Sequence, residues 1–153
     1  MDYLIDLDPT HLVLRLTVRS AVVTLQCAED VYILLARIAQ PNSQKQNAPS
    51  RSPYAAIYEY AAIYDLTAVT GTTLSFNLIR GFARRHPSIP TGRAHVVVGH
   101  EPSIYRMARI FQMCRYHLGD KFQVVQTLEE AHEIVGVRPR DFTERVYPKK
   151  VAA

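Results

Sequence analysis

The sequence predicts an α/β fold built on one mixed, mostly parallel β-sheet with packed helices, in the element order ββαβαβαβα. Short apolar runs at residues 61–64 and 94–98 are joined by about 30 residues with a helical pattern, and such a unit forms two parallel strands. Residues 12–18 alternate apolar and polar side chains, the period of a half-covered strand. We therefore expect the strands around Ile63 and Val97 to be parallel neighbours at the centre of one layered domain.

The first two strands are expected at residues 3–7 and 12–18. The turn between them, Asp8-Pro9-Thr10, is short. Strands joined by so short a turn pair in an antiparallel hairpin, which supplies the antiparallel edge of the sheet.

A helical period follows at residues 24–39, and Pro41 stops it. The apolar positions that share one face of this helix are Ala28, Val31, Leu35 and Ile38. Residues 41–53 contain no apolar side chain larger than Ala48, which predicts a polar surface loop.

The central strand is expected to end at Asp65, and a second helix is expected at residues 72–86. Arg84 and Arg85 fall in its last turn, where cations suit the negative end of a helix. The next strand, at residues 93–99, is apolar without interruption and should be covered on both faces. The side chains expected to line the inner side of the second helix are Leu74, Leu78, Ile79 and Phe82.

A third helix is expected at residues 102–118, because proline suits its first position, and a short strand at 122–125. Thr127 and Glu130 form a capping-box pattern for a last helix at 128–135. Gly136 ends this helix, and residues 137–153 are polar. The domain is therefore expected to span residues 1–136, with a polar C-terminal extension at 137–153.

The charge, the cysteines and the length of the apolar runs argue against several classes of function. The chain has 153 residues, of which 48% are hydrophobic, and a net charge of +4. Its basic residues are dispersed without a nucleic-acid-binding motif, so no nucleic-acid partner is expected. Cys27 and Cys114 have no ligand spacing, and neither a metal nor a cofactor is expected. No apolar run approaches the roughly 20 residues of a membrane span, and no secretory leader is visible, so we expect a cytoplasmic protein.

Three phrases, AAIYDLTAVTG, AHVVVG followed by SIYRMARIFQ, and FQVVQTLEEAHEIVGV, together with the element order, resemble the STAS-domain superfamily. The resemblance covers residues 1–136. Within that superfamily, the chain is similar to the anti-sigma-factor antagonists. It implies a non-enzymatic module that binds partner proteins or small ligands. In those antagonists a Ser at the start of the second helix, preceded by Asp, is phosphorylated. This chain has no Asp-Ser pair there, and the resemblance points to Thr72 or Thr73 instead.

The candidate binding residues lie where polar groups follow the two central strands, since ligands dock at the carboxyl edge of parallel sheets. They are Asp65, Thr67, Thr70, Thr72, Thr73, Ser75 and His100. Structural roles compete with binding at these positions: Asp65 can organise its own turn, and Thr72 can cap the second helix. Asp65 and His100 could also move protons, but no nucleophile motif accompanies them, so an enzyme is not expected.

Two functions remain open at this point. The first is a regulatory module that binds a protein partner through the turn and helix after the central strand. The second is a carrier or sensor of a small apolar or amphipathic ligand, which requires a cavity of several hundred cubic ångström lined by Ile79, Met107 and Phe111. Self-association into a homodimer, through residues 54–60 or an edge strand, is a further expectation.

Overall fold

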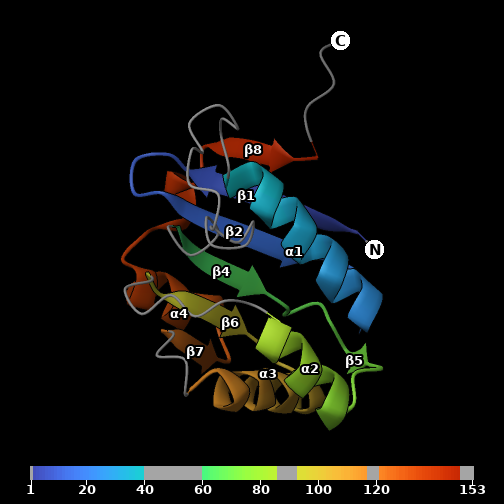
Figure 1. Cartoon of the computed structure of the whole chain (residues 1–153). Coiled ribbons are helices and arrows are strands. Elements are labelled where there is room, and N and C mark those ends of the chain that lie inside the picture. Colours follow the sequence, from blue (N-terminus) through green and yellow to red (C-terminus); the bar gives the residue numbers. More distant parts are fainter. Residues whose placement is uncertain (1, 40–59, 86–92, 117–120, 149–153) are drawn as a thin grey trace.

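The computed structural model describes residues 2–39, 60–85, 93–116 and 121–148, and its centre is a six-stranded sheet with the strand order β7-β6-β4-β2-β1-β8 (Figure 1). Its strands are β1 (Tyr3–Asp8), β2 (Val13–Val18), β4 (Ala61–Asp65), β6 (His95–Val98), β7 (Phe122–Val125) and β8 (Glu144–Tyr147). A second sheet pairs β3 (Val22–Val23) with β5 (Gly71–Thr72). The helices are α1 (Leu25–Ala39), α2 (Phe76–Arg85), α3 (Pro102–Arg115) and α4 (Leu128–Val135).

Strands β1 and β2 form the expected antiparallel hairpin, in which Tyr3 lies opposite Val18. The second strand begins one residue later than expected, at Val13. Leu12 belongs to the turn and has a left-handed backbone with φ of 54°, which removes it from the strand.

Strands β2, β4, β6 and β7 run parallel to one another. Ile63 pairs with Val96 and Asp65 with Val98, so the two central strands are parallel neighbours as the sequence predicted. All five residues of β4 are buried, which places this strand in the middle of the domain. The fold class, a mostly parallel mixed α/β sheet, is confirmed.

The helices cover both faces of the sheet. Helices α1, α2 and α3 pack on one face, and α4 packs on the other (Figure 1). Alternation along the strands sets this division: Leu14 and Leu16 of β2 point into the core beneath α1–α3, whereas Val13 points toward α4. The continuous apolar run of the parallel strands therefore serves two separate cores.

The helix ends in the second half of the chain follow the sequence signals. Pro102 occupies the first turn of α3. The Thr127 side chain accepts a hydrogen bond from the Glu130 backbone N–H, and Gly136 ends α4 with a left-handed φ of 79°. Residues 117–118 of the expected third helix lie outside the described residues.

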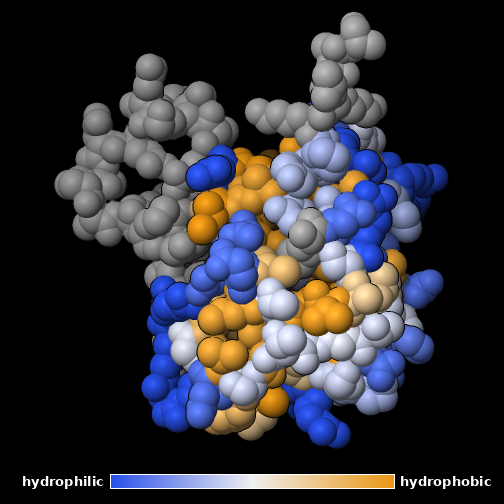
Figure 2. Space-filling view, turned by 90° about the vertical axis from the view of Figure 1, so that its right-hand side faces the viewer, coloured by the Kyte–Doolittle hydropathy of each residue, from blue (hydrophilic) through white to orange (hydrophobic). Residues whose placement is uncertain are grey.

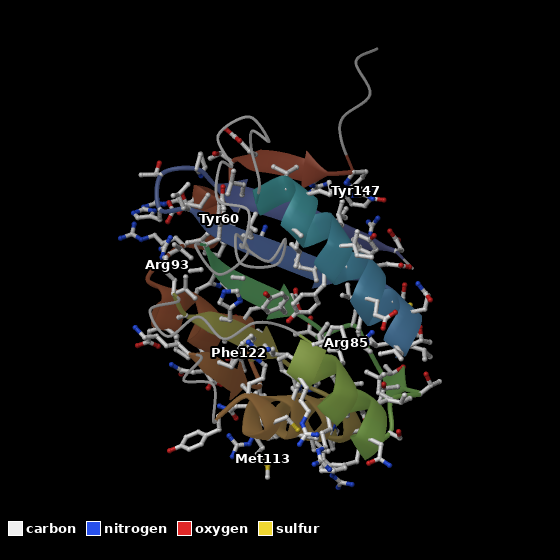
Figure 3. All side chains as sticks on the ribbon, in the orientation of Figure 1. Tyr60, Arg85, Arg93, Met113, Phe122 and Tyr147 are labelled. Carbon is white, nitrogen blue, oxygen red and sulfur yellow. The ribbon has the colours of Figure 1, made fainter. Side chains whose placement is uncertain are left out.

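The C-terminal segment contributes more to the fold than expected. A 3₁₀ turn at Pro139–Asp141 leads into β8, which pairs antiparallel with β1. Tyr147, labelled in Figure 3, ends β8, and its ring stacks on that of Tyr3 with centroids 5.1 Å apart. Residues 144–147 thus form an edge strand of the main sheet. The expected loop at 41–53 lies outside the described residues.

Candidate functional site

The candidate site is built at the carboxyl ends of β4 and β6, where the sequence placed most of its polar residues. Leu66 continues beside β6, and its backbone N–H donates to the Val98 carbonyl at 2.9 Å. The chain then makes a turn, adds the short strand β5 and enters α2. The turn and the helix are therefore fixed to the rigid centre of the sheet.

Asp65 organises this turn. Its side chain is buried at 6% exposure, and its Oδ1 accepts hydrogen bonds from the Thr67 backbone N–H at 3.0 Å and the Thr67 hydroxyl at 2.7 Å. A short carboxylate bonded to the backbone two residues on is a standard turn-forming arrangement. Both Asp65 and Thr67 therefore have a structural role here.

Thr70 and Thr72 attach the turn to the segment before α1. The Thr70 hydroxyl donates to the Ala21 carbonyl at 3.3 Å, and the Thr72 hydroxyl donates to the Val23 carbonyl at 2.9 Å. These bonds reinforce the parallel β3–β5 pair. They account for two of the threonines at this turn, Thr70 and Thr72, whose hydroxyls bond backbone carbonyls of residues 21–23.

The expectation that α2 begins at Thr72 is wrong, because Thr72 lies in β5 and the helix begins at Phe76. The Ser75 hydroxyl accepts from the Leu78 backbone N–H at 3.3 Å, so Ser75 rather than Thr72 caps the helix. Of the two residues expected to be phosphorylated, Thr72 is half-buried with its hydroxyl engaged, whereas Thr73 is exposed. Phosphorylation at either residue stays a prediction.

His100 is exposed and follows the end of β6. No hydrogen bond or ion pair between His100 and Asp65 occurs in the part of the chain that the structure describes. The carboxylate of Asp65 is instead directed to Thr67. The structure therefore does not bring the proposed proton-transfer pair into contact.

The sequence predicted the helix after the central strand as a binding element with its arginines facing outward, but not the exposed apolar side chains beside them. Phe76 is 55% and Leu78 40% exposed, and Leu78, which was expected to face inward, is thus a correction. At 100° per residue, these two side chains lie on the flanks of the outward face, and Arg80 and Arg84 lie between them. We call these four residues the α2 surface. Figure 2 views the side of the molecule where α2 begins and shows hydrophobic residues gathered beside hydrophilic ones.

Two of the three arginines of α2 have no ion-pair partner among the residues that the structure describes. The helix carries three arginines and no acidic residue. Arg85 pairs with Glu29 of α1, but neither Arg80 nor Arg84 forms an ion pair with any described residue. The absence of acidic residues from FNLIRGFARR was the sequence signal that could have revealed this face.

Gly81 lies at the middle of the same outward face. It is exposed, and a Cβ atom built on it would meet nothing within 4 Å. Glycine inside a helix costs roughly 0.5–1 kcal/mol relative to alanine, and nothing in the described fold requires it here. The space beside its Cα atom is open, which is compatible with a close backbone approach from outside.

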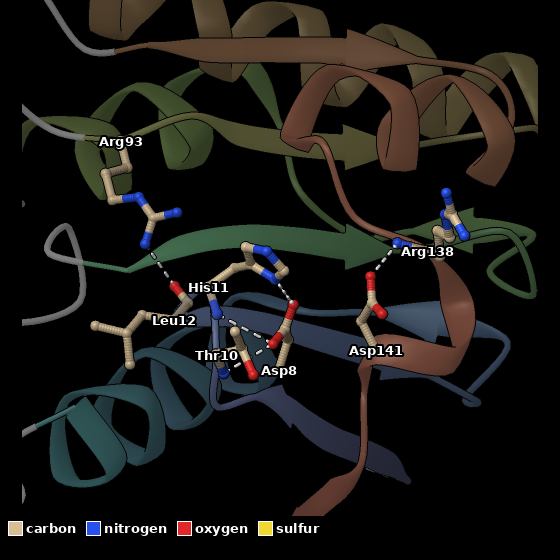
Figure 4. Close-up of polar contacts among 7 residues, drawn as sticks. All are labelled: Asp8, Thr10, His11, Leu12, Arg93, Arg138 and Asp141. Atoms are coloured by element: carbon tan, nitrogen blue, oxygen red, sulfur yellow. Dashed lines mark hydrogen bonds and ion pairs between the residues drawn. The ribbon is translucent and has the colours of Figure 1, made fainter.

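A second polar cluster lies at the opposite end of the sheet, where the β1–β2 turn meets the 3₁₀ turn at Pro139–Asp141 (Figure 4). Asp8, His11 and Asp141 each bring one potential ligand atom within 4.8 Å of the others. Asp8 already accepts bonds from His11 Nδ1 at 2.7 Å and from the backbone N–H groups of Thr10 and His11. Burial alone would raise the pKa of Asp8, but these hydrogen bonds hold it below its ordinary value. The cluster thus stabilises the turn.

One buried histidine, His95, lies in the central strand β6. His95 is 1% exposed, and its Nδ1 lies 2.8 Å from the Tyr64 hydroxyl. Burial, together with the nearby charges of Arg115 and Arg93, lowers its pKa to about 3. His95 therefore remains neutral at physiological pH and belongs to the core.

No protein-family model matches the chain, and comparisons with curated proteins and with solved structures find no match. The STAS resemblance accordingly stays a prediction that rests on the quoted phrases and the element order. None of the helices in the described residues has both the length and the apolar character needed to cross a bilayer.

Proposed function

We propose that this protein is a non-enzymatic, cytoplasmic regulatory module of STAS-like type that binds a protein partner through the α2 surface. The observation that carries the proposal is the combination of exposed Phe76 and Leu78 with Arg80 and Arg84, whose charges find no ion-pair partner among the described residues. Exposed apolar side chains bordered by charge are typical of interaction sites.

The turn beneath this surface favours binding because it is already ordered. Asp65, Thr70 and Thr72 use their side chains to hold the turn and β5 in place, and Ser75 caps the helix. A preorganised surface loses little conformational entropy on association. In this proposal the polar residues of the turn act as support, and the α2 surface makes the contact.

The chemistry of the surface defines the partner. Phe76 and Leu78 require apolar groups, and Arg80 and Arg84 require carboxylates. The open space at Gly81 lets a backbone approach closely. Phe76, Arg80 and Arg84 follow one another at four-residue spacing on one side of α2, and Leu78 borders the other flank. An acidic amphipathic helix of another protein suits the first side, since its apolar residues and its carboxylates repeat at the same helical spacing.

Phosphorylation would regulate this contact. Thr73 is exposed and lies three residues before the start of α2. A phosphate there adds about two negative charges beside the surface and repels an acidic partner. The proposal thus expects phosphorylated Thr73 to weaken partner binding.

Site-specific photo-crosslinking in the cells that make the protein tests the proposal. A photoreactive phenylalanine analogue replaces Phe76 in one variant and Ile134 in a matched control, because Ile134 is a 37% exposed apolar residue of α4. We expect a discrete adduct with a second protein from position 76 and none from position 134. Equal adducts from both positions, or none from position 76, would refute the proposal.

Charge reversal separates specific contact from chance capture. Arg80→Glu with Arg84→Glu is expected to reduce the adduct from position 76 at least tenfold. The control, Arg138→Glu with Arg140→Glu, changes the net charge equally at exposed residues elsewhere and is expected to leave it unchanged. An adduct between two copies of this chain would instead show self-association and would contradict a separate acidic partner.

A further inference from the structure

An apolar cavity of about 120 Å³ lies between the sheet and helices α1, α2 and α3. The residues expected to line a ligand cavity, Ile79, Met107 and Phe111, all line it, but its volume is smaller than the several hundred cubic ångström expected of a carrier site. The cavity lies under the inner side of α2, away from the α2 surface. An inference from it is therefore independent of the proposed function.

The lining of the cavity is poor in hydrogen-bonding groups. It is almost entirely apolar, with aliphatic side chains such as Leu16 and Val31 alongside aromatic ones. A buried water needs two to four polar partners, and so apolar a lining offers water few of them. An apolar guest that enters this space therefore displaces only weakly held water.

Aromatic rings form much of the lining. The rings of Tyr32 and Phe82 meet edge to face with centroids 5.0 Å apart, and Phe111 meets Phe122 in the same way at 5.3 Å. Tyr64 completes the set of aromatic lining residues. Edges and faces of rings arranged in this way attract a further ring, and the thioether of Met107 adapts to its shape.

We propose that this cavity binds a small neutral aromatic molecule of about the size of benzene. A comparable apolar cavity of about 150 Å³ in another protein binds benzene and xenon, so the volume suits a single unsubstituted ring. A polar substituent is disfavoured because its hydrogen bonds to water would be lost without replacement. Among the lining residues, Cys27, Leu74 and Met107 are only half-buried, so the cavity lies close to the surface between the helices.

The experiment titrates the full-length protein with benzene and follows methyl NMR signals and the melting temperature. We expect shifts confined to cavity residues such as Val31 and Ile79, and a Tm increase of about 3–5 °C at roughly ten times the Kd. Phenol, whose hydroxyl gains few hydrogen bonds from so apolar a lining, is expected to bind about tenfold more weakly or worse. Absent benzene shifts, or phenol binding as tightly as benzene, would overturn the proposal.

Two variants localise the site. Ala28→Leu fills the cavity from α1 and is expected to abolish the benzene shifts. Arg37→Leu adds the same side chain on the exposed face of the same helix and is expected to preserve them. If Ala28→Leu does not fold, intermolecular NOEs from benzene to the Val31 and Ile79 methyl groups of the wild-type protein decide the location. Contacts elsewhere, or equal binding in Ala28→Leu, would refute the assignment.

Discussion

The buried neutral histidine predicts a steep loss of stability in mild acid. His95 has a pKa of about 3 in the folded protein against 6.5 in the unfolded chain. As the pH falls below 6.5, the unfolded state takes up a proton that the folded state does not bind. The linkage therefore lowers the free energy of unfolding as the pH falls from 6.5 toward 3, and it leaves stability unchanged above that window.

The size of the effect follows from the difference in pKa. Each unit of pKa difference corresponds to 1.36 kcal/mol, so acidification from about pH 7.5 to pH 5 costs about 2 kcal/mol through His95 alone. A domain of this kind has only about 5–15 kcal/mol of total stability. Burial, together with nearby Arg15, also lowers the pKa of His132, which adds to the loss in the wild-type protein.

Urea unfolding curves at about pH 7.5, 6.5, 5.5 and 5.0 measure the effect. His95→Gln stays neutral over this range and keeps a hydrogen-bonding group near Tyr64, so it should remove the His95 share of the pH dependence and leave that of His132. His100→Gln removes an exposed histidine and should keep the wild-type slope. If His95→Gln and the wild type lose stability in parallel between pH 7.5 and 5, the reasoning about His95 is refuted.

Three substitutions test local packing and capping by urea unfolding. Gly99→Ala should destabilise the protein by about 1–3 kcal/mol, because its Cβ would lie 3.2 Å from the Tyr105 backbone nitrogen at the start of α3; unchanged stability would contradict this close approach. Gly81→Ala should stabilise the protein by about 0.5–1 kcal/mol, since the added Cβ meets no atom within 4 Å. The same substitution should weaken the crosslink from position 76. A destabilised variant would show that the fold needs this glycine. Thr127→Ala should cost about 1 kcal/mol through loss of the cap on α4, and a cost near zero would show that the cap is dispensable.

The main sheet and its helices could be predicted from the sequence because their signals are long and periodic. The alternation in β2 and the unbroken apolar run of β6 indicated strands with different coverage. The third and fourth helices carried terminal signals at Pro102, Thr127 and Gly136. Each of these signals depends only on neighbouring residues, through backbone geometry or capping, and can therefore be recognised in a single sequence.

Shorter elements could not be predicted for an equally physical reason. Strands β3 and β5 have two residues each, too few to show a period, and their pairing is reinforced by Thr70 and Thr72 hydroxyls across a long sequence separation. Strand β8 is a polar edge strand, and Arg145 reaches Asp6 of β1 at 2.7 Å. That ion pair joins residues far apart in the chain, so no local sequence pattern predicts it.

The candidate residues lie at the carboxyl edge of the sheet, as expected from the sequence, but the polar residues of the turn have mainly structural roles. Asp65 and Thr72 were assigned a binding role from their types, yet each satisfies a neighbouring backbone group. Several hydroxyls in succession also hid which one caps α2. The exposure of Phe76 and Leu78 depends on how the helix rotates onto the sheet, and that rotation becomes visible only in three dimensions.

Charge-swap rescue tests the central claim, that the α2 surface binds an acidic protein partner, most directly. Mass spectrometry of the adduct from position 76 identifies the partner carboxylates that lie nearest to it. Replacing one of them by lysine should restore the adduct to a protein that carries Arg80→Glu and Arg84→Glu. Failure of every such swap to restore it, with both proteins folded, would contradict a direct contact between these arginines and an acidic partner.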